Sequence, residues 1–150
     1  MKHLIFIAFI VFSQTNIILA QDQVSDDSES LFERLGGVEG ITLIVDDVIE
    51  AHMINPVIKD IFTPLKAHPE RLEKIRQHTI EFFSAGSGGP VVYKGRKMTL
   101  THEGMDISAE EYMCVMDDIM NVLEEHGIDE TSKKDVLAIL WSLKEMIMGK

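Results

Sequence analysis

Two histidines have neighbours that would let their imidazole rings take part in chemistry. The apolar spacing predicts a helix over residues 69–85, and on it His78 lies three residues after Ile75 and four before Phe82, on or beside the apolar face. His102 lies in a stretch without clean periodicity, among methionine, leucine and isoleucine. Taken singly, each histidine is better explained without a chemical role, His78 as an exposed helix residue and His102 as a half-buried loop residue.

Aromatic side chains and a group of cations accompany the two histidines. Phe62, Phe82 and Phe83, together with methionines, predict an apolar pocket around them. Such a pocket suits a flat apolar cofactor with a metal at its centre, because neutral imidazole is a common iron ligand. Three basic residues of this acidic chain come just before His102, and they would pair with carboxylates of that cofactor: Lys94, Arg96 and Lys97. Without a cofactor, the same cations are a solvated turn.

Other chemistries are poorly supported. Residues 86–89 have the composition of a phosphate-binding loop, but no strand precedes them and no Gly-Lys-Ser/Thr opens a helix after them. These glycines fit the end of a helix better. The sequence also shows no His-Glu-x-x-His pattern, no nucleophilic serine elbow and no Cys-His pairing, so hydrolytic and thiol chemistry are not indicated.

Helices must position these candidate residues. Apolar periodicity predicts four substantial helices, over residues 38–53, 69–85, 108–126 and 129–147. Shorter helical pieces are predicted over residues 31–35, 57–62 and 98–102, the last within an irregular connection over residues 91–106. Ser30 with Glu33, and Ser108 with Glu111, have the spacing of capping boxes. No strand pattern or internal repeat is evident, so the predicted fold class is all-α.

The composition is that of one folded acidic domain. The 150 residues include 25 acidic and 14 basic ones, and the formal charge of −11 argues against nucleic acid as a partner because phosphates would be repelled. Hydrophobic residues make up 45% and charged residues 26%, as in a chain that folds around a core. Cys114 is the single cysteine, which excludes an internal disulfide and a multi-cysteine metal site.

The N-terminal residues are expected to lie outside this domain. Residues 1–20 have the pattern of a secretory signal peptide: Lys2, an apolar run from Leu4 to Phe12, and a short tail that ends at Ala20. The run is far shorter than the roughly 20 apolar residues of a membrane-spanning helix. We therefore expect an exported mature protein, periplasmic or secreted, with no membrane anchor after signal removal. Residues 21–30 are predicted to form a disordered acidic tether.

A series of short motifs follows in a fixed order along the rest of the chain. The motifs are Leu-Phe-Glu-Arg-Leu-Gly-Gly at residues 31–37, Phe62, Glu-Phe-Phe at 81–83, Gly-Gly-Pro at 88–90, Tyr-x-Gly at 93–95 and Met98-x-x-x-His102. Each motif is weak alone, but their order and spacing are quite specific. From residue 31 to about residue 147, the chain resembles the group 1 truncated haemoglobins.

The resemblance implies a truncated globin domain over residues 31–150, built as a two-over-two helical sandwich around haem b (iron protoporphyrin IX). It places His102 at the proximal histidine that binds iron and Phe62 at the phenylalanine that packs against the porphyrin. Phe82 and Phe83 fall on haem-contacting positions of the distal helix. The remaining candidates for cofactor binding are Ile75, His78, Thr79, Arg96, Lys97 and Met98. The chain has no Cys-x-x-Cys-His motif, so haem should be held without thioether bonds to cysteine.

The distal side departs from the family pattern. Group 1 members usually carry a Phe-Tyr pair, whose tyrosine donates to bound oxygen, and often a distal glutamine. Val48, Ile49 and Thr79 occupy these positions. His78 lies where some cyanobacterial members place a histidine that binds iron, so it is a second candidate metal ligand, or a donor to the gas.

The resemblance implies reversible binding of oxygen, nitric oxide or carbon monoxide at an iron held by His102. Nitric oxide dioxygenation is an activity that this resemblance permits, with an electron-donor protein or reductase that the sequence does not identify. Two alternatives stay open. The protein could be a bis-histidine haem protein for redox or gas sensing, with His78 and His102 both on iron, or a helical interaction module without haem.

Overall fold

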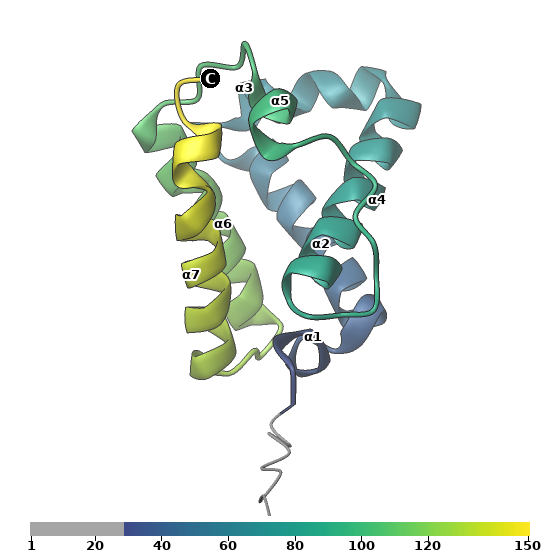
Figure 1. Ribbon diagram of the computed structural model, residues 1–150. Coiled ribbons are helices and arrows are strands. Elements are labelled where there is room, and N and C mark those ends of the chain that lie inside the picture. Colours follow the sequence, from purple (N-terminus) through teal and green to yellow (C-terminus); the bar gives the residue numbers. More distant parts are fainter. Residues whose placement is uncertain (1–28) are drawn as a thin grey trace, which may run out of the picture.

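The computed structural model describes residues 29–150 (Figure 1). The predicted signal peptide and residues 21–28 of the predicted tether lie outside the described residues. Within the described part, helices and irregular connections make up the chain and no strand is present, which confirms the all-α prediction. The elements are α1 (Leu31–Arg34), α2 (Gly37–Ile54), α3 (Lys59–Phe62), the 3₁₀ helix η1 (Thr63–Ala67), α4 (Pro69–Gly86), α5 (Met98–His102), α6 (Ala109–Glu125) and α7 (Glu130–Ile147).

The four long helices form two pairs, which lie side by side in the view of Figure 1. Helices α2 and α4 pack together as one pair, and α6 and α7 as the second. Contacts between α2 and α6 join the two pairs. At the edge of the first pair, Arg76 of α4 donates from Nη2 to Oδ2 of Asp46 on α2 over 2.9 Å. This arrangement is the expected two-over-two sandwich.

Local sequence signals explain where three of the helices begin. Ser30 before α1 and Ser108 before α6 each complete a capping box with the glutamate three residues later. The Asp129 carboxylate accepts from the backbone N–H groups of Thr131 and Ser132 and so caps α7. These hydrogen bonds satisfy N–H groups that the first turn of a helix leaves without partners.

The segment between α2 and α4 differs from its prediction. The helix predicted over residues 57–62 begins only at Lys59, and a 3₁₀ helix continues it from Thr63 to Ala67. The Asn55 side chain causes the late start, because its Oδ1 accepts from the backbone N–H of Val57 over 3.0 Å and forms a turn there. Pro64 in the first turn of η1 fits a helix start because it has no N–H to satisfy.

The hydrophobic core lies between the two helix pairs. It is built from one apolar face of each long helix, and Ile41, Leu123 and Val136 are among its most deeply buried side chains. The short helix α1 joins it through Leu31 and through its C-cap residue, Leu35. Because these positions recur every three or four residues, the core follows the periodicity of the sequence.

Residues 87–97, called the strap below, connect α4 to α5 without regular secondary structure and run beside α4 (Figure 1). The segment after α5 is joined to the end of α7, since the N–H of Gly149 donates to the Ile107 carbonyl and the N–H of Asp106 to that of Lys150. These bonds hold α5 beside α7. None of the described helices is long and apolar enough to cross a membrane.

Candidate functional site

His102 is the last residue of α5 and is half-buried. Its Nδ1 lies 2.9 Å from the carbonyl oxygen of Met98, one turn earlier in the same helix. A carbonyl oxygen only accepts hydrogen bonds, so Nδ1 carries a proton, and in the neutral ring Nε2 then has the lone pair. A histidine oriented through one ring nitrogen in this way presents the other to a metal.

Helix α4 carries a row of half-buried side chains along the face that the sequence indicates: Ile75, His78, Thr79, Phe82 and Phe83. The hydroxyl of Thr79 donates to the Ile75 carbonyl over 2.9 Å, so its proton is already used within the helix. None of the side-chain hydrogen bonds found in residues 29–150 involves His78. Its two ring nitrogens are therefore free of bonds to the described protein groups.

The strap lies against this row of α4. The ring of Tyr93 meets Phe82 edge-on at a centroid distance of 5.3 Å, and it meets His78 edge-on at 6.2 Å. The backbone N–H of Lys94 donates to Oε2 of Glu81 over 3.2 Å. These contacts bring His78, Phe82 and the strap together as one group. No hydrogen bond or ring contact joins His78 to His102 in the described residues.

Phe62 lies at the end of α3 and packs on a histidine that sequence reasoning left out. Its ring centroid is 4.8 Å from that of His52, which is 5% exposed. Nδ1 of His52 lies 2.9 Å from Oδ2 of Asp118, and Asn55 donates to Oδ1 of the same carboxylate over 2.8 Å. Burial lowers the pKa of His52, and the contact with Asp118 offsets this only in part. His52 follows Val48 by four residues, a spacing that could have identified it as buried.

The cations before α5 are exposed. Arg96 and Lys97 form none of the ion pairs found among residues 29–150, and Lys97 is the N-cap residue of α5. Their charges are thus free to pair with carboxylates beside His102. The same exposure fits a solvated turn, the alternative that the sequence left open.

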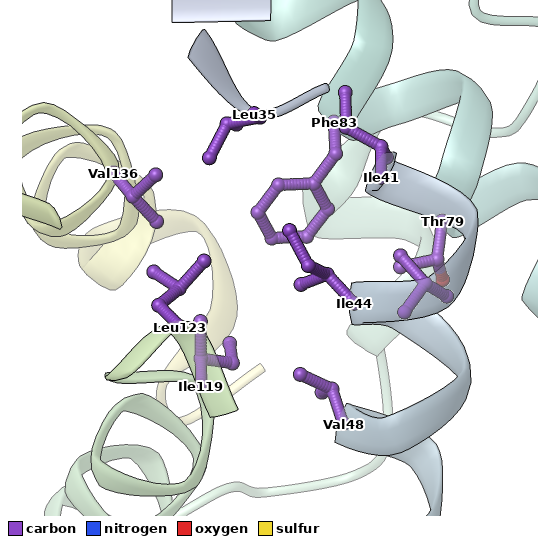
Figure 2. A pocket seen from close by; sticks show the side chains of 10 residues that line it. Leu35, Ile41, Ile44, Val48, Thr79, Phe83, Ile119, Leu123 and Val136 are labelled. Atoms are coloured by element: carbon purple, nitrogen blue, oxygen red, sulfur yellow. The ribbon is translucent and has the colours of Figure 1, made fainter. Parts of the chain in front are cut away.

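A small apolar cavity of about 20 Å³ lies between the two helix pairs (Figure 2). Figure 2 shows the Phe83 ring between the side chains of α2 and those of α6. Thr79 also lines the cavity, so the cavity reaches the row of α4 side chains described above. The space is large enough for one water, but its apolar lining offers a water few partners. It suits a small apolar molecule better.

The residues of this region fit a haem. Large apolar side chains of α3, α4 and α5 remain half-buried in the protein alone, namely Phe62, Ile75, Phe82 and Met98. Covering such surface is favourable by roughly 25 cal/mol per Å², and a porphyrin supplies two flat apolar faces. Residues 29–150 contain no group of three or more His, Cys, Asp or Glu arranged for a bare metal ion. The oriented imidazole of His102 is the available metal ligand. One histidine is enough for an iron that takes its other ligands from a porphyrin.

Comparison with known proteins shows the family of this chain. The family model described as bacterial-like globin matches residues 30–148. A group 1 truncated hemoglobin of Synechocystis is 29% identical over 114 residues, which cover 73% of this chain and 88% of the relative. A group 1 truncated hemoglobin of Mycolicibacterium paratuberculosis is 22% identical over 111 residues, which cover 74% of this chain and 78% of the relative.

Solved structures show the same fold. The truncated hemoglobin of Tetrahymena pyriformis in its Fe(III) form superposes with a TM-score of 0.74 at 20% identity, covering 81% of this chain and all of that one. The 2/2 hemoglobin of a Synechococcus species, with covalently attached heme, gives a TM-score of 0.68 at 21% identity and covers 77% of this chain and 94% of that one. Because the family model spans nearly all described residues, this chain belongs to the bacterial-like globin family as a truncated haemoglobin, a family whose cofactor is haem b.

Proposed function

We propose that the protein holds the iron of haem b through Nε2 of His102 and binds a diatomic gas reversibly on the opposite side, where His78 is the available polar group. The observation that carries this proposal is the 2.9 Å contact from His102 Nδ1 to the Met98 carbonyl, which leaves the lone pair of Nε2 for a metal. Haem iron would supply the coordination position at which oxygen, nitric oxide or carbon monoxide binds.

The other candidate residues would orient the haem. Phe62, Ile75, Phe82 and Met98 offer apolar surface to the porphyrin, and Phe83 extends this surface toward the core. Arg96 and Lys97, exposed beside α5, would pair with the haem carboxylates at the solvent edge. Exposed ion pairs contribute at most about 1 kcal/mol, so these pairs would mainly orient the haem and add little to its binding free energy.

The distal side favours gas exchange over tight oxygen storage. Val48 is buried and Ile49 half-buried on α2, and neither can donate a hydrogen bond. The Thr79 hydroxyl proton is bonded to the Ile75 carbonyl. A neutral hydrogen bond to a ligand is typically worth about 1 kcal/mol, so its absence would weaken oxygen retention about fivefold. The apolar cavity behind Thr79 and Phe83 offers a gas a place next to this side.

A second candidate function follows from the free ring nitrogens of His78. With both nitrogens free of bonds to described protein groups, the imidazole can take the sixth iron position, and the protein would then serve in redox or gas sensing. Nitric oxide dioxygenation would additionally need electrons from a reductase. The charge of −11 favours a basic electron-donor protein for that role.

Export is a separate part of the proposal and is supported by the sequence alone. Residues 1–20 would direct the chain out of the cytoplasm and be removed, leaving a periplasmic or secreted haem protein without a membrane anchor. The intact mass of protein recovered from the periplasm and the medium tests this. A cytoplasmic protein that retains residues 1–20 would contradict it.

Absorption spectra of the protein after haem addition test the central proposal. Ferric and ferrous spectra would be recorded for the wild type, His102→Ala, His78→Ala and a matched control, His68→Ala, at an exposed residue whose side chain does not cap α4. His102→Ala should lose the histidine-ligated spectrum, and His68→Ala should keep it. Failure of the wild type to bind haem would leave the haem-free helical module.

The ferric spin state separates the two candidate functions. A high-spin spectrum that is unaffected by His78→Ala indicates an open site for gas. A low-spin spectrum that becomes high-spin only in His78→Ala indicates two-histidine ligation and favours redox or sensing. Oxygen dissociation measured on the same variants then shows whether His78 donates to the gas.

A further inference from the structure

Tyr93 of the strap is the aromatic neighbour of His78. The ring planes of the two residues are inclined by 77° at a centroid distance of 6.2 Å. Tyr93 also meets Phe82, one turn further along α4, at 5.3 Å and 79°. Edge-to-face packing of this kind is the favourable geometry for aromatic rings. The Tyr93 ring therefore contacts two α4 residues that the proposed function places at the haem.

The Tyr93 ring is held from its other end. Its hydroxyl donates to the carbonyl oxygen of Arg96 over 2.9 Å. The backbone of Gly95 lies against the ring, because a Cβ built on Gly95 would be 2.1 Å from the tyrosine oxygen and 2.2 Å from the ring carbon that carries it. The Lys94 backbone is in turn bonded to Glu81 on α4. The strap thus fixes Tyr93 and requires a residue without a side chain at position 95.

This arrangement also connects α4 with α5. Arg96 is separated from α5 only by the N-cap residue Lys97, and its carbonyl receives the tyrosine hydroxyl. The Met98 carbonyl that orients His102 lies two residues further on. One aromatic side chain therefore touches His78 on one side and is anchored next to the His102 helix on the other.

We propose that Tyr93 is a positioning residue for His78, which holds the imidazole against the strap and so weakens its competition with gas for the iron. This rests on the proposed function. The His78 side chain forms none of the side-chain hydrogen bonds found in residues 29–150, so the ring contact with Tyr93 is the directional interaction that restrains the imidazole there. When His78 moves away from the strap to bind iron, that contact is lost.

Two substitutions test the role of Tyr93 without changing His78. Tyr93→Ala removes the ring. Gly95→Ala keeps the ring but displaces it, since its new Cβ would overlap the tyrosine hydroxyl. The matched control is Gly86→Ala, because a Cβ there has open space. Neither Gly95 nor Gly86 has a positive φ, so alanine strains the backbone at neither position.

The first measurement needs no haem. In the haem-free protein, NMR should show ring-current shifts of the His78 imidazole protons that disappear in Tyr93→Ala and change in Gly95→Ala. Gly86→Ala should leave them as in the wild type. His78 shifts that are the same in all four proteins would overturn the inference, because the contact would then be absent in solution.

The second measurement uses the haem-loaded protein. The ratio of His78-bound to His78-free ferric haem, read from low-spin and high-spin absorption, should rise about two- to tenfold in Tyr93→Ala and Gly95→Ala, the range expected for loss of one edge-to-face contact. Gly86→Ala should match the wild type. In a His78→Ala background, Tyr93→Ala should have no effect on spin state, as required if Tyr93 acts through His78.

The outcomes separate this inference from the proposed function. Loss of haem binding in the wild type would contradict the proposed function and, with it, the role of Tyr93 at the haem. Normal haem binding through His102 with a spin state that ignores Tyr93, or that changes equally with and without His78, would overturn the inference alone. A fall in the low-spin fraction of Tyr93→Ala would also overturn it, because Tyr93 would then press His78 toward the iron.

Discussion

The partner of each imidazole sets its chemistry in this protein. The Nδ1–H of His102 donates to a backbone carbonyl, which leaves Nε2 for a metal. His52 uses the same nitrogen toward the Asp118 carboxylate but is buried among side chains. His126 contacts the Asp47 carboxylate through Nε2 over 2.7 Å at the surface. His102 combines an oriented ring with a half-buried position beside the half-buried Met98, whereas His52 is buried, so His102 is the ligand candidate.

The buried His52 predicts a loss of stability in acid. Its pKa is lowered from 6.5, first because burial disfavours the charged ring, with Asp118 acting in the opposite direction. Below pH 6.5, His52 of the unfolded chain binds a proton. His52 of the folded chain binds one only at a lower pH, near its own lowered pKa. The free energy of unfolding should therefore be fully present above pH 6.5 and fall as the pH decreases below it. This single group contributes at most about 1.4 kcal/mol per pH unit.

Urea unfolding at pH 7.5 and pH 5.5 measures this effect. His52→Asn keeps an N–H donor for Asp118 but does not titrate, so the difference in unfolding free energy between the two pH values should shrink. His68→Asn replaces an exposed histidine and should leave the difference as in the wild type. An unchanged difference in His52→Asn would show that other groups cause the acid sensitivity.

The sequence identified individual candidate residues of the site but not their contacts. His78 and His102 stood out because apolar residues flank them, and the structure gives each a half-buried position. The hydrogen bonds of His52 to Asp118 and of Tyr93 to Arg96 depend on where each side chain points in the folded protein. Periodicity predicts the face on which a residue lies, but it does not predict which partner that residue meets.

At the scale of elements, the joint between α1 and α2 depends on a close backbone approach. Gly40, in the first turn of α2, lies so near α1 that a Cβ would be 2.1 Å from the Leu35 carbonyl oxygen. Gly36 before it has a φ of 83°, in the left-handed region that glycine adopts readily. The two glycines let α1 fold back onto α2 and bring Leu31 and Leu35 into the core.

Gly40→Ala should therefore destabilise the fold by about 1–3 kcal/mol, the usual range for overpacking, because the obstructing atom belongs to the backbone. Gly86→Ala, at the end of α4 in open space, should be neutral or slightly stabilising. Chemical denaturation of the two variants beside the wild type makes the comparison. Equal stability of both would mean that α1 shifts away from α2 at little cost.

Sequence signals for elements worked where a local side chain bonds the backbone. The capping residues Ser30, Ser108 and Asp129 mark helix starts that the structure confirms. The predicted start of α3 was two residues too early. The Asn55 amide oxygen accepts from the N–H of Val57 and forms a turn there, which competes with helix formation. The 3₁₀ helix after it has too short a period to be recognised from apolar spacing. How the strap lies against α4 depends on tertiary contacts and could not be predicted either.

At the scale of the whole molecule, stability and the candidate site depend on different parts of the fold. The two helix pairs meet at the apolar core that surrounds the small cavity, and the candidate haem residues lie on α3, α4 and α5. Phe83 and Thr79 belong to both parts, because they are candidate haem residues of α4 and also line the cavity (Figure 2). Damage to the α6 side of the cavity should therefore weaken the fold without removing a proposed haem residue.

Leu123→Ala tests this separation. Leu123 is 1% exposed on α6 and lines the cavity, so truncation enlarges a space that is already present. The expected loss of unfolding free energy is about 2–5 kcal/mol, as for other buried leucines. Leu137→Ala on α7, at a residue that is 38% exposed, should cost much less. Under conditions where both variants stay folded, each should bind haem in the wild-type ratio with a wild-type spin state. A changed spin state in Leu123→Ala would show instead that core packing reaches His78 or His102 through α4, because no side chain of the proposed site is altered.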